Sequence, residues 1–243
     1  MRNKHLIWVI ILLAMVLALS LLPGSPLSSV NWGLFSLVIA GLVVLMLLWR
    51  FEHSQAAAKE VALVATMAAI AAIFRVPFVF IGGLQPTTFM VMITGYVFGA
   101  QTGFVVGALA ALVSNFFLGQ GPWTPWQMLG WGLCGVLAAI LPGRPGSFKR
   151  VPFALLAGLC GYLFGWLMNL WHWLGFVYPL SIHTFLAVYA ASFPFDTLHA
   201  LGNVVFSLLF GRPFFHILSR FHNNLVPGIL IDDDHESSHN SPK

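Results

Sequence analysis

The sequence contains very few charged residues. Only 7% of its 243 residues are Asp, Glu, Lys or Arg, whereas 59% are hydrophobic. A soluble domain usually carries about a quarter charged residues, so this composition excludes one and indicates an integral membrane protein. The formal net charge of +4 is too small and too dispersed for nucleic-acid binding.

Cysteine and the common catalytic motifs are also scarce. The two cysteines, Cys134 and Cys160, lie in apolar runs and form neither a disulfide framework nor a metal-ligand pattern. The sequence lacks a G-x-x-x-x-G-K-[ST] phosphate loop, an H-E-x-x-H zinc motif and a G-x-S-x-G nucleophile elbow. We therefore expect no ATP site of that kind, no metal and no cofactor.

Long apolar runs make up most of the chain and predict an all-α membrane protein. A helix needs roughly 20 apolar residues to cross a bilayer, and every backbone polar group there must be paired. We expect a membrane hairpin over residues 1–55, a six-span substrate-binding domain over 56–222 and a disordered cytoplasmic tail over 223–243. The eight predicted spans are 6–22, 32–49, 59–80, 86–99, 103–118, 126–141, 151–171 and 183–210.

Lysine and arginine predict the orientation. With eight spans both termini lie on one side, and ten of the eleven Lys and Arg residues fall on that side. The positive-inside rule identifies this side as the cytoplasm. Only Arg75 falls on the outer side. It either extends to the lipid headgroups or offers its donors to an anionic or carbonyl-bearing ligand.

Three connectors rich in aromatic residues, glycine and proline fall on the outer side. They are Phe78–Pro86, Gly119–Gly132 and Trp171–Pro179. Tryptophan often anchors a protein at the water–lipid boundary. Irregular backbone at membrane depth is tolerated where it lines a cavity. We therefore expect these three loops to enclose a ligand cavity that is open to the outside.

The last predicted span carries a polar stripe. Ser192, Asp196, His199 and Asn203 are spaced i, i+4, i+7 and i+11 on one helix face, and Pro194 is expected to kink the helix. A membrane-embedded Asp costs about 2.5–3.5 kcal/mol on insertion scales and needs partners or water. The stripe either holds the bundle together, with Asp196 and His199 bonded to each other, or contacts a substrate; a metal site would need more ligands. The predicted substrate contacts are Arg75, Gln85, Trp123, Trp126, Gln127, Asn169, Trp173, Asp196, His199 and Asn203.

The third predicted span carries a stripe of small residues. Its alanines repeat at spacings of four, three, four and three, which places them on one helix face. Small residues let membrane helices approach closely. The stripe indicates either packing inside the protein or docking on another membrane subunit. Its members are Ala58, Ala62, Ala65, Ala69 and Ala72.

From about Lys59 to Phe215 the sequence resembles an S component, the substrate-capture subunit of energy-coupling-factor (ECF) vitamin transporters. The resemblance rests on KEVALVATMAAIAAIF, RVPFVFIGGLQP, GYVFGAQTGFVVGALAALVSNF, GPWTPWQMLGWGLCG and DTLHALGN. It implies a six-span bundle with cytoplasmic termini in a prokaryotic plasma membrane and a vitamin bound near the outer face, under the first loop. It also implies that the alanine stripe docks on a scaffold subunit with two ATP-binding subunits. The N-terminal hairpin departs from this pattern.

The resemblance also suggests a substrate. The GPWTPWQ variant is most similar to S components assigned to cobalamin or related corrinoids, and riboflavin-, queuosine- and lipoate-type substrates are the alternatives. Enzymatic activity is not expected. Two other functions stay open at this point: a membrane enzyme that uses Asp196 and His199, and a membrane assembly factor without a ligand.

Overall fold

The computed structural model describes residues 31–53, 58–81, 83–141 and 147–225. This part of the chain is helical and contains no β-strand, which confirms the all-α class. The predicted span 6–22 and the segment 226–243 lie outside these residues. The helices are α2 (Trp32–Glu52), α3 (Ala58–Phe78), α4 (Thr87–Phe98), α5 (Ala100–Leu118), α6 (Thr124–Ala138), α7 (Arg150–Phe176) and α8 (Ile182–Leu225).

Five of these helices, α2, α3, α5, α7 and α8, are long and apolar enough to cross a membrane. By contrast, α4 has 12 residues and α6 has 15, which is shorter than a usual span. The short α4 lies inside the bundle, where it contacts α3, α5, α6, α7 and α8, and its residues Thr87–Gly95 are all buried. Helix ends inside protein are tolerated at membrane depth, so α4 need not reach across the lipid. The number of eight spans stays a prediction.

Helices α4, α5 and α6 approach so closely that they require glycine at their contact. A Cβ atom added at Gly103 would lie 2.6 Å from the Cα atom of Gly95 and 2.9 Å from the carbonyl oxygen of Gly135. No side chain can be accommodated there, so backbone packs directly on backbone. This contact holds α6, and with it the tryptophans of α6, in a defined position against α4 and α5.

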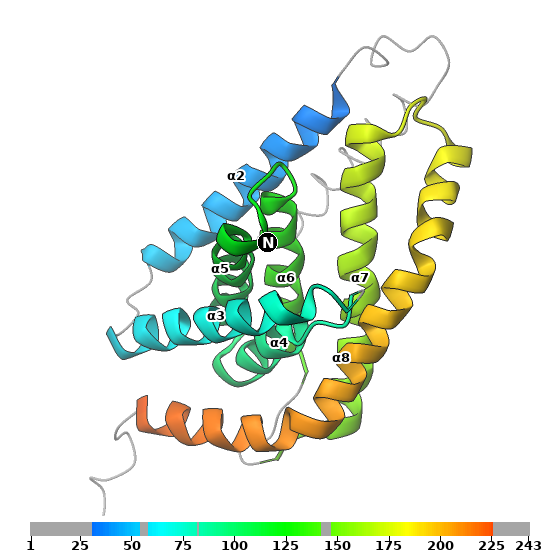
Figure 1. Cartoon of the computed structure of the whole chain (residues 1–243). Helices are drawn as coiled ribbons and strands as arrows, with labels where there is room; N and C mark the ends of the chain where they lie inside the picture. The colour runs from blue at the N-terminus through cyan, green and yellow to red at the C-terminus, as the bar shows by residue number, and fades with distance from the viewer. Residues whose placement is uncertain (1–30, 54–57, 82, 142–146, 226–243) are drawn as a thin grey trace, which may run out of the picture.

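The remaining helices cover this centre from two sides. α7 runs along α8 on one side, while α2 packs against α5, α6 and α7 (Figure 1). Trp32 at the start of α2 forms a small buried cluster with Trp173 and Leu174 of α7. The second half of the predicted hairpin is therefore packed on the bundle.

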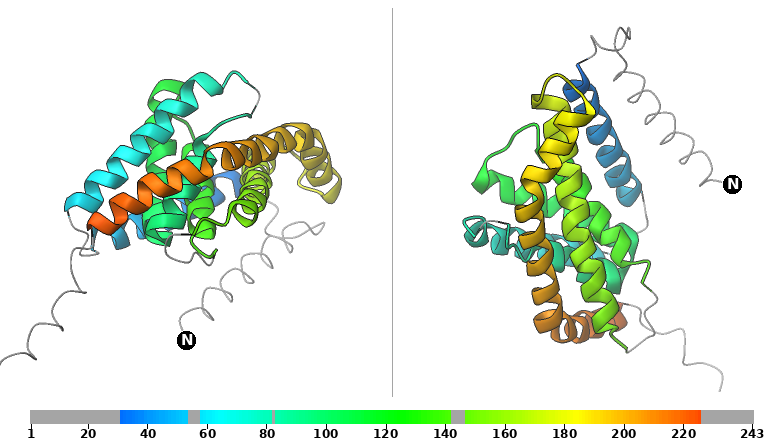
Figure 2. Two further views of the ribbon diagram at one scale, coloured as in Figure 1. Left: turned by 90° about the horizontal axis from the view of Figure 1, so that it is seen from below. Right: turned by 90° about the vertical axis from the view of Figure 1, so that its right-hand side faces the viewer.

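Two predicted boundaries are wrong. Trp171–Pro179 was expected to be a loop, but α7 continues to Phe176, because no proline interrupts it before Pro179. The last helix was expected to end at residue 210, but α8 continues to Leu225 with Pro194 and Pro213 inside it. Its C-terminal part turns away from α7 and runs back along the base of the bundle (Figure 2), where Phe215 and Leu218 join the core. The predicted tail therefore begins inside a helix.

Candidate ligand-binding site

A cavity of about 250 Å³ lies between α3, α6, α7, α8 and the connector before α4. Its lining combines polar side chains with aromatic rings, which is the usual composition of a small-molecule site. Six of the ten predicted substrate contacts line it. These six are Arg75, Gln85, Gln127, Asn169, Asp196 and His199.

Arg75 lines the cavity from the last turn of α3. It is only 5% exposed, so it lies within the bundle and does not extend to lipid headgroups. Its Nη1 atom donates hydrogen bonds to Ser114 Oγ at 2.5 Å and Asn115 Oδ1 at 2.7 Å. Its guanidinium carbon lies 4.6 Å from the ring centroid of Trp131, within the range of a cation–π contact. The Nε atom is buried without a hydrogen-bond partner in the described structure.

Asn115 connects Arg75 to the tryptophan- and proline-rich loop. Besides accepting from Arg75, its Nδ2 atom donates to Gln127 Oε1 at 2.8 Å and to Thr124 Oγ1 at 3.1 Å. The Thr124 hydroxyl in turn donates to Gln120 Oε1 at 2.9 Å. The conformation of the loop is thereby coupled to the position of the buried guanidinium.

Asp196 faces the cavity from α8 and is 3% exposed. Its Oδ2 atom accepts hydrogen bonds from Ser192 Oγ at 3.0 Å and from Asn169 Nδ2 at 3.1 Å. The Oδ1 atom has no hydrogen bond to the described residues, and it lies against the backbone of Gly165, where any side chain would collide with it. A buried charge without full pairing is expensive, so the free oxygen requires a polar partner.

The predicted hydrogen bond between Asp196 and His199 does not form. His199 Nε2 lies 3.0 Å from Thr88 Oγ1, and Trp131 Nε1 donates to the same hydroxyl at 3.0 Å. The two residues are three positions apart on one helix, but each forms a hydrogen bond with another helix instead of with the other residue. Asp196 bonds to α7 and His199 bonds to α4.

Two aromatic rings form an apolar wall beside these polar groups. Trp131 of α6 and Phe164 of α7 are stacked, with ring centroids 4.5 Å apart and planes 24° from parallel. His199 meets Phe164 edge-on at 5.4 Å. On the remaining side, Gly83 of the connector has a positive φ of 92° and packs against the ring of Phe195. A non-glycine residue would be strained there, so this glycine lets the connector close over the cavity.

Four predicted contacts lie outside the cavity lining. Trp123 packs edge-on against Trp171 at 6.3 Å, which joins two of the aromatic segments. Trp126 is buried, and its Nε1 atom has no partner in the described structure. Trp173 donates to Thr184 Oγ1 at 3.0 Å. Asn203 is fully buried deeper in α8.

Several lining residues were not among the predicted substrate contacts. They include Trp131, which is one turn after Gln127, and Gly165, which is one turn before Asn169. Helical spacing from these two predicted polar residues could have identified both. The other additional lining residues are Gly83, Phe164, Met168, Ser192 and Phe195.

The cavity does not have the composition of a metal site. No group of three or more His, Cys, Asp or Glu side chains comes together anywhere in the described ranges. The chemistry that the cavity can perform is binding: one cation, one carboxylate, an imidazole and several amides face an aromatic wall.

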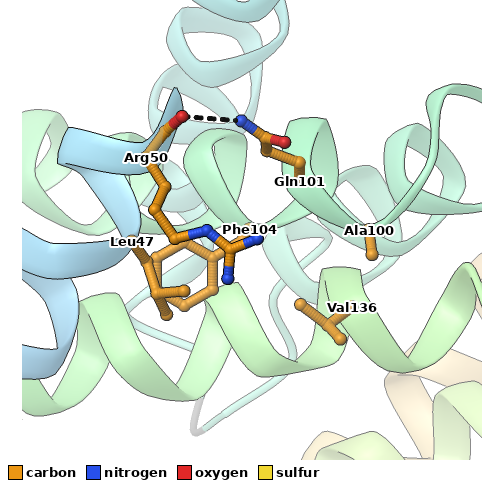
Figure 3. A pocket seen from close by; sticks show the side chains of 6 residues that line it. All are labelled: Leu47, Arg50, Ala100, Gln101, Phe104 and Val136. Carbon is orange, nitrogen blue, oxygen red and sulfur yellow. Dashed lines mark hydrogen bonds between the residues drawn. The ribbon is translucent and has the colours of Figure 1, made fainter. Parts of the chain in front are cut away.

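A second cavity, of about 360 Å³, lies between α2, α5 and α6 (Figure 3). Leu47, Phe104 and Val136 give it a mostly apolar lining. Gln101 donates to the backbone carbonyl of Arg50 at 3.3 Å, so its amide is already engaged. Arg50 and Gln101 supply the polar side chains of this lining, whereas the first cavity is lined by more polar groups, including both charges. The first cavity is therefore the candidate ligand site.

The alanine stripe of α3 lies mainly on the surface. Ala58, Ala62, Ala65 and Ala69 are exposed, and Ala72 is buried. The exposed four have no neighbouring helix in the described structure. They form a smooth outer face on a helix whose other side is in the core.

Comparison with known proteins agrees with this description. The family model of the ECF transporter substrate-specific component matches residues 59–210, which is more than half of the chain. No curated protein and no solved structure matched the chain. The matched segment contains α4–α7 in full and every residue that lines the candidate cavity. The chain therefore belongs to the ECF transporter family, as a substrate-specific component.

Proposed function

We propose that this S component captures a small micronutrient in the cavity between α3, α6, α7 and α8, and releases it inside the cell when docked on an ECF scaffold with two ATPases. The observation that supports the capture step is the pair of incompletely bonded charges, Arg75 and Asp196, in one cavity of a membrane bundle. Each charge costs about 2.5–3.5 kcal/mol to insert at membrane depth. A bound ligand that pairs with both charged side chains would offset this cost.

The volume of the cavity supports a small ligand. At about 250 Å³ it lies below the range of roughly 300–1,000 Å³ that is typical for drug-sized molecules. A corrinoid, the substrate that the sequence suggests, is considerably larger than such molecules. A corrinoid would require the connector and the loop before α6 to move far apart, so we favour a compact substrate.

The orientation of the protein in the membrane determines the side from which the substrate enters. The positive-inside pattern supports cytoplasmic termini in a prokaryotic plasma membrane. The connector with Gly83 and the start of α6 then face outward, so the substrate enters from outside and the connector acts as its cover. The packing of Trp123 on Trp171 keeps the neighbouring aromatic segments together on that side.

Docking uses the exposed face of α3. Ala62, Ala65 and Ala69 carry no bulk beyond Cβ, so a helix of the scaffold can pack against the α3 backbone. Ala72 is buried and supports this face from within. The enzyme alternative has less support, because the family that matches the chain is one of transporter components.

The test is to expose the purified full-length protein in detergent to yeast extract, wash it, and identify retained compounds by mass spectrometry. We expect one compound at about one molecule per protein, displaced by an excess of the same pure compound. A protein that retains nothing, and that no member of a vitamin panel stabilises against thermal unfolding, contradicts the capture role.

A further inference from the structure

We propose that the ligand carries both an anionic group and a basic nitrogen. The inference rests on the proposed capture function and specifies the substrate class. It follows from two features of the cavity: a buried arginine without a carboxylate partner and a buried aspartate without a cationic partner.

The surroundings of Arg75 are suited to an anion. The partners of Arg75 in the described structure are neutral: the hydroxyl of Ser114, the amide oxygen of Asn115 and the ring of Trp131. These contacts use Nη1 and the face of the guanidinium, and Nε is left without a partner at a side chain that is 5% exposed. A planar guanidinium held in this way presents its remaining donors in the geometry that binds a carboxylate with two parallel hydrogen bonds.

The surroundings of Asp196 are suited to a cation. Ser192 and Asn169 donate to one carboxylate oxygen and hold the group in place. The other oxygen has no hydrogen bond to the described residues and lies against the backbone of Gly165, beside the cavity that both residues line. Asn169 and Ser192 carry no charge, so in the described structure nothing compensates the carboxylate.

The two charges do not neutralise each other. No ion pair joins Arg75 to Asp196, although both line one cavity. A ligand with only an anionic group would leave the carboxylate of Asp196 buried and unpaired. A ligand with only a cationic group would leave the guanidinium of Arg75 buried and unpaired. Both cases are costly in a low-dielectric site. A ligand with both groups pairs each charge at once.

An apolar wall lies beside the two charged groups and suits the apolar part of a small ligand. Phe164 stacks on the indole of Trp131, Arg75 lies over the same indole, and His199 contacts Phe164. Because these neighbours cover the indole, the wall offers the ligand apolar contact at its edges. The indole of Trp131 is also held by its hydrogen bond to Thr88, so the wall exists before the ligand binds.

The experiment identifies the compound that the full-length protein retains from yeast extract, and then measures the affinity of the pure compound and its methyl ester. We expect a compound with an acidic group and a basic nitrogen. Its ester, which lacks the anion, should bind the wild-type protein at least tenfold more weakly. This comparison uses wild-type protein and needs no variant to fold.

Variants then test which group of the ligand binds Arg75 and which binds Asp196. Arg75→Gln and Asp196→Asn should each weaken binding at least tenfold, and Arg75→Lys should recover part of the loss. The ester should bind Arg75→Gln and wild type equally, because both complexes lack the same contact. Arg220→Gln and Glu52→Gln are matched controls at exposed positions and should bind normally.

The outcomes separate the two proposals. A retained compound without a basic nitrogen, or without an acid, overturns the inference and leaves the capture function intact. Unchanged binding by Asp196→Asn has the same effect. If no compound is retained and none from the vitamin panel binds, both proposals fail together.

Discussion

Replacing Gly165 by alanine tests whether Asp196 belongs to the ligand site. Gly165 lies inside α7, and alanine in a helix is more stable than glycine by about 1 kcal/mol. A Cβ atom at this position would lie only 2.5 Å from the carboxylate carbon of Asp196, whereas ordinary contacts begin at 3.4 Å. The carboxylate must therefore retreat by at least about 0.9 Å, since its Oδ1 atom lies closer still, or the helices must separate.

The free energy of ligand binding that this movement of the carboxylate costs can be estimated. A shift of this order lengthens the hydrogen bonds from Asn169 and Ser192, which are 3.1 Å and 3.0 Å long, beyond a useful distance. Hydrogen bonds to charged groups contribute about 1.5–3 kcal/mol each. Losing one ligand contact of that kind lowers the affinity by at least tenfold. We therefore expect Gly165→Ala to bind the retained compound at least tenfold more weakly.

The assay compares Gly165→Ala with Gly175→Ala by isothermal titration of the retained compound and by thermal unfolding. Gly175 lies on the same helix, and an added Cβ atom there meets nothing within 4 Å. The control should bind normally and unfold no earlier than wild type. If Gly165→Ala binds and unfolds like the control, the carboxylate does not hold the ligand and the reasoning is refuted.

Three further predictions test other parts of the structure. Ala65→Leu with Ala69→Leu should abolish co-purification with the scaffold and leave ligand binding unchanged. The control Ala187→Leu, on the exposed surface of α8, should retain both co-purification and ligand binding. Retained co-purification of the double variant would contradict the docking face. Trp123→Cys should react with a membrane-impermeant maleimide in intact cells, because both native cysteines are buried and give little background; reaction only after lysis would reverse the orientation. Thr88→Val should leave His199 Nε2 and Trp131 Nε1 unpaired and lower the free energy of unfolding by about 1–3 kcal/mol for each of them. Denaturation in detergent measures this change, and unchanged stability would exclude the hydrogen-bond network.

Local patterns predicted the elements of the fold well. The spacing of Ser192, Asp196 and His199 identified one face of α8, and all three residues line the cavity. Arg75 was singled out because it breaks the positive-inside trend, and it lines the same cavity. In both cases a polar residue in an apolar run is expensive enough to mark a site.

Contacts between helices that are far apart in the sequence could not be predicted in the same way. His199 bonds to Thr88, 111 positions earlier in the chain, and no spacing rule reaches that far. Trp173 was expected in a loop near the ligand because it lies in an aromatic, glycine-containing segment. It is instead helical and packs with Trp32 of α2, an element that the resemblance did not include. Tertiary contacts, which depend on the whole chain, decided both outcomes.

The pairing of α7 with α8 predicts that stability and ligand binding are coupled in this protein. Gly158, Gly161 and Gly165 lie on one face of α7, and Cβ atoms there would meet Val204, Ala200 and Asp196 of α8 respectively. The face of α8 that needs this close approach is thus the face that carries the polar stripe. Close packing brings the carboxylate to Asn169, and the absence of a side chain at residue 165 makes room for its second oxygen. A ligand bound to this carboxylate stabilises the native bundle by RT ln(1 + L/Kd), where L is the free ligand concentration, so the stabilisation grows with the logarithm of the ligand concentration.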